Sequence, residues 1–182
     1  LLEIIPSHKE ERMRHGWVVM VAALMGASQA SAASGKAAIQ ATKPGSAVSG
    51  EATLTETKGG LRVSVQVRSV SPGKHGLHIH DRGSCEEAGN AAGGHYNPDN
   101  APHGFLPKDG FTKAHPGDLG NITAGKDGNG RLKLTLKNVH LQEGTYTVAN
   151  RAIVLHEKVD DFAQPTGNAG GRIGCGVITL AE

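Results

Sequence analysis

The chain has 182 residues, enough for one domain with extra segments, and its formal net charge is +2 at neutral pH. So small a charge, without a basic run interleaved with aromatics, argues against binding to nucleic acid or to an anionic membrane. Glycine is abundant, with 26 residues, whereas aromatic residues make up only 3%. The core must therefore be built from Val, Ile, Leu and Ala, and short β-branched runs between turns favour an all-β fold, a small sandwich or barrel.

The first 32 residues predict a leader and an export signal. Residues 1–12 precede Met13 and show no structural pattern, so we interpret them as unstructured or misassigned sequence. A basic start, an apolar run over residues 17–25 and the small residues Ala30-Ser31-Ala32 follow in the order of a secretory signal peptide. That run is well short of the roughly 20 residues of a membrane-spanning helix. We expect a signal peptide over 13–32, a mature domain over 33–182, and no stable membrane association after cleavage.

From residue 36 onward the pattern predicts about eight short strands separated by turns. The clearest covers residues 61–68, where Leu and Val alternate with Arg, Ser and Gln, as in an antiparallel strand with one solvated face. A second alternation covers residues 131–137, after a hairpin-type turn over 126–130. The other expected strands are residues 36–42, 50–57, 76–80, 118–123, 146–148, 152–156 and 175–180.

One of these strands carries two histidines, in Gly76-Leu77-His78-Ile79-His80. Because side chains alternate between the two faces of a strand, His78 and His80 share one face, while Leu77 and Ile79 face the core. A His-x-His pair alone is a weak signal. It becomes a strong one only if other ligands occur elsewhere in the chain.

Two stretches lack any regular pattern. Residues 81–117 are rich in Gly, Pro, Asn and Asp, and residues 157–174 form a second loop with Asp160 and Arg172. Long irregular loops in compact domains are usually functional or disordered, so we expect a metal or a disulfide to order the first one. That loop contains Cys85, His95, His103 and His115.

The two cysteines, Cys85 and Cys175, lie too far apart for a CxxC motif. Two interpretations stay open: buried free thiols, or one disulfide that closes a long loop and stabilises the fold by about 4 kcal/mol in the chain-entropy model. The export signal favours the disulfide, because such bonds persist outside the cytosol.

Residues from distant parts of the chain have the chemistry of metal ligands. His103 and His115, followed by Asp118, offer imidazoles and one carboxylate, which suits tetrahedral zinc. A set of imidazoles from strands suits copper. That set consists of His78, His80 and His156. Any one histidine could be a solvated or hydrogen-bonded residue, but six histidines and an aspartate in this arrangement favour metal binding.

Several segments together resemble the copper/zinc superoxide dismutase family. Residues 76–83, GLHIHDRG, and residues 167–178, GNAGGRIGCGVI, are similar to its two signatures. Between them lie GHYNP at 94–98, HPGDLGN at 115–121 and HEK at 156–158. The resemblance runs from about residue 36 to residue 180. It implies an eight-stranded antiparallel Greek-key β-barrel, an immunoglobulin-like sandwich, with two long functional loops.

The resemblance also implies one copper and one zinc ion per subunit. The implied copper ligands are His78, His80, His95 and His156. The implied zinc ligands are His95, His103, His115 and Asp118. His95 would then bridge the two metals. His75 matches a histidine beside the site that is not a ligand.

Further roles follow from the same resemblance. Asp160 would accept hydrogen bonds from His78 and His103, and Cys85 would form a disulfide with Cys175. The implied catalytic residues are Arg172, which holds a small anion, and His95, which carries a proton. The activity implied is dismutation of superoxide to oxygen and hydrogen peroxide, as antioxidant defence outside the cytosol. We expect a homodimer in the periplasm or outside the cell.

The second loop departs from the eukaryotic pattern of the family. It is short, and Gln164 and Pro165 stand where a guiding lysine and its neighbour are expected, although Lys158 remains. This leaves the strength of electrostatic steering open. The alternative function is a non-enzymatic copper/zinc buffer or chaperone-type relative. A chaperone would carry a CxxC segment, which the printed sequence lacks, and degenerate relatives lose copper ligands or the arginine, which are all present here.

Overall fold

The structure, a computed structural model, describes residues 2 and 32–181. The expected leader over residues 1–12 and nearly all of the expected signal peptide over 13–32 lie outside the described residues. The boundary between signal and mature domain therefore stays a prediction. Among the described residues, no helix is both long enough and apolar enough to cross a membrane.

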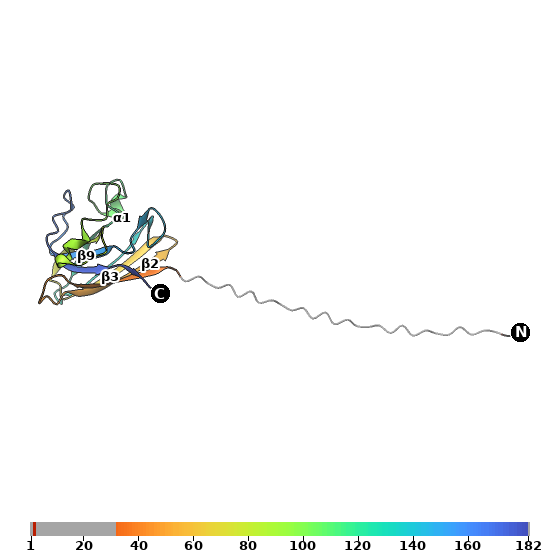
Figure 1. The fold of residues 1–182 in the computed structure, drawn as a ribbon, viewed down its shortest axis with the longest axis horizontal. Helices are drawn as coiled ribbons and strands as arrows, with labels where there is room; N and C mark the ends of the chain where they lie inside the picture. The colour runs from red at the N-terminus through yellow and green to blue at the C-terminus, as the bar shows by residue number, and fades with distance from the viewer. Residues whose placement is uncertain (1, 3–31, 182) are drawn as a thin grey trace. The chain divides into compact units, whose positions relative to one another are not determined.

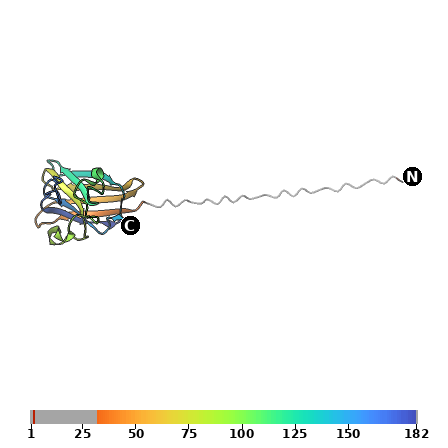
Figure 2. The same cartoon turned by 90° about the horizontal axis from the view of Figure 1, so that it is seen from above.

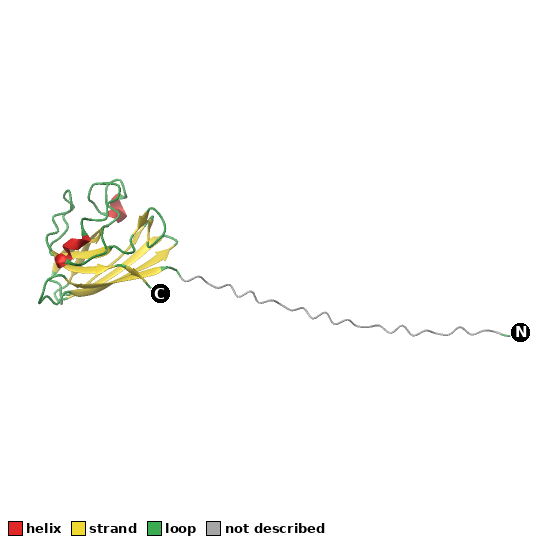
Figure 3. Cartoon of the chain, in the orientation of Figure 1, coloured by secondary structure: helices red, strands yellow, loops and turns green. Residues whose placement is uncertain are grey.

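The described part of the chain forms eleven strands and two short helical segments. Figures 1 and 3 show how they are arranged and the loops that join them. The barrel strands are β1 (Ser34–Ala41), β2 (Ser49–Thr57), β3 (Gly60–Arg68), β4 (Gly73–His80), β5 (Asp118–Ala124), β6 (Gly130–Leu136), β9 (Ala152–His156) and β10 (Arg172–Val177). The shorter elements are β7 (Val139–His140), β8 (Tyr146–Thr147), β11 (Thr179–Leu180), the 3₁₀ segment η1 (Glu87–Ala92) and α1 (Leu106–Asp109).

The eight longer strands close into an antiparallel barrel, seen in a second view in Figure 2. Around the barrel their order is β1-β2-β3-β6-β5-β4-β9-β10, and β10 pairs again with β1. Because β3 pairs with β6 rather than with β4, the connection has Greek-key topology. Closure leaves no long unpaired edge among the described strands that could template aggregation. The predicted all-β Greek-key barrel is confirmed.

The core follows the alternation in the sequence. On β3 the Leu and Val side chains are buried, whereas Arg62 and Arg68 are exposed. On β4, Leu77 and Ile79 are fully buried in the same apolar core. The reverse face of β4 is thereby free to present its histidines toward the loops.

The C-terminal part differs from the expected strand over residues 175–180. Strand β10 begins at Arg172 and is separate from the two-residue strand β11, so the second loop ends at Gly171. The strand begins early because Arg172 pairs with His156, across an irregularity before Gly174. Likewise, the expected strand over 146–148 is only β8, which pairs in parallel with β7.

A disulfide joins the first loop to β10. Cys85 is bonded to Cys175, with their Cα atoms 5.7 Å apart, which resolves the alternative of free thiols. Of the first loop, η1 and α1 are the helical pieces, and the rest is irregular (Figure 3). The disulfide therefore fastens this long loop beside the strand that carries Arg172.

Candidate metal centre

Strand pairing brings the strand histidines together. Strand β4 pairs with β9 so that His78 lies opposite Val154, two residues before His156 at the end of β9. The Nε2 atoms of His80 and His156 lie 3.3 Å apart. His95, from the first loop, joins them through an isolated antiparallel bridge to His80. Nitrogen atoms of these four rings lie within 4.8 Å of one another.

Hydrogen bonds on the outer sides of two rings determine which nitrogens face inward. Nδ1 of His80 lies 2.9 Å from the carbonyl oxygen of Gly93, and Nδ1 of His156 lies 3.3 Å from that of Gly170. A carbonyl oxygen only accepts, so each Nδ1 donates and each Nε2 of a neutral ring carries a lone pair. These two Nε2 atoms face each other at 3.3 Å.

His78 adds a third inward nitrogen. Its Nε2 donates to Asp160 Oδ2 at 2.8 Å, and its buried Nδ1 has no hydrogen-bond partner. Burial lowers the pKa of His80 to about 2 and that of His156 to about 3, so these rings stay neutral. Converging lone pairs without a proton to share fit a bound cation, and imidazole nitrogens suit copper or zinc.

A second group lies on the other side of His95. Its members are His95, His103, His115 and Asp118, whose ligand atoms again lie within 4.8 Å of one another. Asp118 Oδ1 is 3.0 Å from Nδ1 of His95 and 3.1 Å from Nδ1 of His115. Asp118 Oδ2 is 2.9 Å from Nδ1 of His103. This His103 Nδ1 nevertheless makes no well-aligned hydrogen bond. Ligands of one tetrahedral ion sit about 3.3 Å apart, because the bonds are about 2.0 Å long, so this spacing fits a zinc site.

Asp118 is ionised in this setting. Burial alone would raise its pKa, but the three neighbouring imidazoles and hydrogen bonds from the main chain hold that pKa far below its usual value. The backbone N–H groups of Gly104 and His115 donate to Oδ2 at 3.0 and 2.9 Å. A buried, charged carboxylate needs a positive charge beside it, which protonated His103 supplies in the metal-free protein and a bound metal ion would supply in its place.

Asp160 connects the two groups. Its Oδ2 accepts from His78 and its Oδ1 lies 2.9 Å from Nε2 of His103, so one carboxylate orients a ring from each group. Despite burial, hydrogen bonds from these rings lower the pKa of Asp160. Burial likewise opposes protonation of His103, but Asp118 and Asp160 raise its pKa to about 9. Such partners fix ring orientation and the ligating nitrogen.

Beside the first group lies a hollow of about 210 Å³, smaller than the usual site for a large organic ligand. His80, His95, His156 and Arg172 contribute to its lining. The Arg172 guanidinium donates to the carbonyl oxygen of Gly89 and, at 2.5 Å, to that of Gly93. The carbonyl oxygen of Gly93 also accepts from Nδ1 of His80, so the Arg172 guanidinium and the His80 ring are both hydrogen-bonded to the same oxygen. The hollow can take a small anion next to the converging nitrogens.

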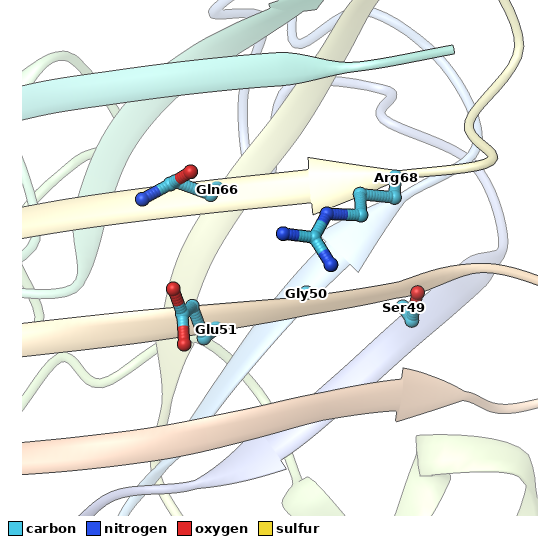
Figure 4. A pocket seen from close by; sticks show the side chains of 5 residues that line it. All are labelled: Ser49, Gly50, Glu51, Gln66 and Arg68. Atoms are coloured by element: carbon cyan, nitrogen blue, oxygen red, sulfur yellow. The ribbon is translucent and has the colours of Figure 1, made fainter.

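Another hollow, on the barrel wall, lacks the histidines that line the hollow beside Arg172. It lies across β2 and β3, with Glu51 and Gln66 opposite each other and Arg68 extended above Gly50 (Figure 4). Ser49 completes the lining, and no imidazole takes part. It therefore has no set of nitrogen donors comparable with that of the first group.

Two further histidines in the part of the chain that the structure describes lie outside both groups, as expected. His75 places Nδ1 2.9 Å from the carbonyl oxygen of His156 and Nε2 2.8 Å from that of Ser71. His140 has a side chain that is 39% exposed and lies 3.5 Å from Glu56. Neither ring faces the converging nitrogens.

Comparison with known proteins agrees with this geometry. The model of the copper/zinc superoxide dismutase family matches residues 48–178. The chain belongs to this family. It is 36% identical over 129 residues to an extracellular superoxide dismutase [Cu-Zn] of Brugia pahangi, a match that covers 65% of this chain and 63% of that relative. For this superoxide dismutase family member, copper and zinc are the implied cofactors, and both donor groups fit them.

The residue types of the site were predictable, but some of its supports were not. The carbonyl groups of Gly89 and Gly93 that hold Arg172 are main-chain atoms without a side-chain signal. The sequence signals these two positions only through the residue type, because both have a positive φ, +84° at Gly89 and +77° at Gly93, which glycine adopts readily. The contacts of Gln164 with the first loop were also missed, because they depend on how the short second loop folds back.

Proposed function

We propose that this protein dismutates superoxide, with one copper and one zinc ion per chain. The observation that carries the proposal is the hollow where Arg172 lies beside inward-facing, neutral imidazole nitrogens. A fixed cation next to a redox metal suits a small anionic substrate. The reaction takes two superoxide ions and two protons to one oxygen and one hydrogen peroxide.

The ligand assignment follows from the two donor sets. Copper would be held by His78, His80, His95 and His156. Zinc would be held by His95, His103, His115 and Asp118. Copper supplies the chemistry that accepts one electron and returns it, which zinc, having no redox states, does not supply. The ring of His95 belongs to both donor groups.

The protein's own residues bind the substrate and supply a proton. The guanidinium of Arg172 attracts each superoxide and orients it in the hollow, and its donors to Gly89 and Gly93 keep the group in place. Nδ1 of His95 lies 3.0 Å from Asp118 Oδ1, so Nε2 is the ring nitrogen left to take a proton from solvent and pass it to the substrate. One superoxide loses an electron and leaves as oxygen. The second gains that electron and two protons, one from His95 and one from solvent.

We also propose that the protein is exported and works in the periplasm or outside the cell. The relative's designation as extracellular, the order of residues over 13–32 and the Cys85–Cys175 disulfide support export. A homodimer is a proposal that rests on the family alone. Sedimentation equilibrium of the protein tests it, with a mass of twice the chain as the expected result.

A matched pair of histidine variants tests the proposed activity. His156→Ala removes one inward nitrogen and should abolish superoxide dismutation, whereas His140→Ala, at the surface, should leave it unchanged. Cyanide, a ligand of copper, should inhibit the parent protein. Full activity of His156→Ala would contradict the site. Verified copper and zinc without any activity would instead favour a metal buffer.

A further inference from the structure

Gln164 makes a two-point contact with His103 across the two loops. Its side-chain Oε1 accepts from the backbone N–H of His103 at 2.9 Å, and its Nε2 donates to the backbone carbonyl of the same residue at 2.9 Å. The amide does not line the hollow beside Arg172. Gln164 therefore acts on the first loop rather than on the substrate.

His103 is held by the second loop from three directions. Asp160 accepts from its ring nitrogen Nε2, and the Phe162 ring lies along its face, with centroids 6.2 Å apart and planes 23° apart. Gln164 fixes the main chain of the same residue. The remaining ring nitrogen, Nδ1, is thereby held 2.9 Å from the carboxylate of Asp118 and left without a hydrogen-bond partner.

The second loop is also held at Asp160, again by a side-chain amide that makes two hydrogen bonds to the main chain of one residue. The side-chain amide of Asn121, on β5, donates to the backbone carbonyl of Asp160 at 2.9 Å and accepts from its N–H at 2.8 Å. Asn121 thus ties the loop to the barrel, and Gln164 ties the loop to His103. Together they span the segment between Asp160 and Gln164.

We propose that Gln164 is a positioning residue for zinc, whose two hydrogen bonds to His103 slow the release of the metal. The inference rests on the proposed role of His103 as a zinc ligand. An ordinary hydrogen bond changes an equilibrium about fivefold, so losing two, with partial replacement by water, should speed zinc release about tenfold. Among the described residues, the side-chain hydrogen bonds of Gln164 go to His103 and not to a proposed copper ligand, so copper release should change less than twofold.

The test compares Gln164→Met with Gln142→Met. Methionine has nearly the length of glutamine but neither polar atom, and Gln142 is exposed and lines a different hollow, together with Glu56 and His140. Zinc and copper release from the loaded protein are followed with a chromogenic chelator. Amide hydrogen exchange at His103 is measured in the metal-free protein. Gln164→Met should speed both zinc release and His103 exchange, whereas Gln142→Met should change neither.

A further variant and the parent separate the possible failures. Gln164→Glu keeps the acceptor for the His103 N–H but loses the donor, so zinc release should be intermediate. If zinc release is unchanged in Gln164→Met, the inference is overturned but the proposed function is not. The same holds if Gln164→Met speeds the release of both metals equally and also speeds amide exchange across the barrel. If the parent protein binds no zinc, the inference and the proposed function both fail.

Discussion

Gly167 allows the second loop to pack against the Asp160–His103 pair, and Gly167→Ala should disrupt that packing. A Cβ added there would overlap Asp160 Oδ1 and lie 2.6 Å from both Asp160 Cγ and His103 Nε2. Asp160 cannot swing aside freely, because His78, His103 and the N–H of Phe162 all donate to its carboxylate. The methyl group would therefore push apart the hydrogen bonds that couple the two donor groups.

Gly45 supplies a matched control. It has φ of +76°, close to the +74° of Gly167, but an added Cβ would meet nothing within 4 Å. A left-handed alanine costs about 1–2 kcal/mol, partly offset by lower entropy of the unfolded chain, so Gly45→Ala should cost about 1 kcal/mol. Gly167→Ala adds overpacking, about 1–3 kcal/mol, for a total of about 3 kcal/mol.

Urea unfolding of the metal-free, disulfide-bonded protein measures the difference. The midpoint should fall further for Gly167→Ala than for Gly45→Ala, and thermal unfolding should place the two variants about 6 °C apart. Zinc release should also be faster in Gly167→Ala only. Equal loss of stability in both variants would show that the contact with Asp160 and His103 carries no energetic weight, and would refute the reasoning.

Three further predictions concern the anion site, the disulfide and pH. Arg172→Ala should retain both metals but lower kcat/KM at least about tenfold and weaken the dependence of kcat/KM on salt. Arg172→Lys should recover part of the lost kcat/KM, because the positive charge stays but the two-pronged guanidinium is lost. A rate unchanged by both substitutions would remove Arg172 from the substrate site. The Cys85→Ser/Cys175→Ser variant should lose about 4 kcal/mol in urea unfolding, because the bond closes a loop with a sequence separation of 90; a loss below about 1 kcal/mol would contradict this. In the metal-free protein, burial lowers the pKa of His80 to about 2, of His156 to about 3 and of His95 to about 4. Below pH 6.5 these rings bind protons when the protein unfolds, so the free energy of unfolding should fall as the pH is lowered from 6.5 to 4. A single such ring would lower it by roughly 1.4 kcal/mol per pH unit, and three rings together should lower it more steeply. The raised pKa of His103, about 9, acts in the opposite sense, and its contribution is lost as the pH rises through 9. A flat profile between pH 4 and 6.5 would contradict the burial of neutral rings.

The parts of the fold that could be predicted are those that depend on local alternation. Strand β3 follows from a period of two, because a buried and a solvated face need different side chains. On β4 the same period separates Leu77 and Ile79 from His78 and His80, although both faces are buried. The beginning of β10 could not be read in this way. Arg172 joins the strand through its pairing with His156 and through carbonyl groups of the first loop, which are tertiary contacts.

The site divides along the same line. The donor types in both metal groups are visible in the sequence, because imidazole and carboxylate side chains are common ligands of those ions. Which nitrogen faces inward depends on carbonyl acceptors such as Gly93 and Gly170, which have no side-chain signature. The contact between Gln164 and His103 depends on the path of the shortened loop, which the sequence pattern does not determine.

The most direct test of the central claim is the decay of superoxide, followed by pulse radiolysis, in the presence of protein whose copper and zinc content has been measured. The account predicts one copper and one zinc per chain and a decay that is first order in protein. Oxygen and hydrogen peroxide should form in equal amounts, and protein that holds zinc alone should be inactive. A protein with both metals verified that leaves the spontaneous decay unchanged would contradict the account.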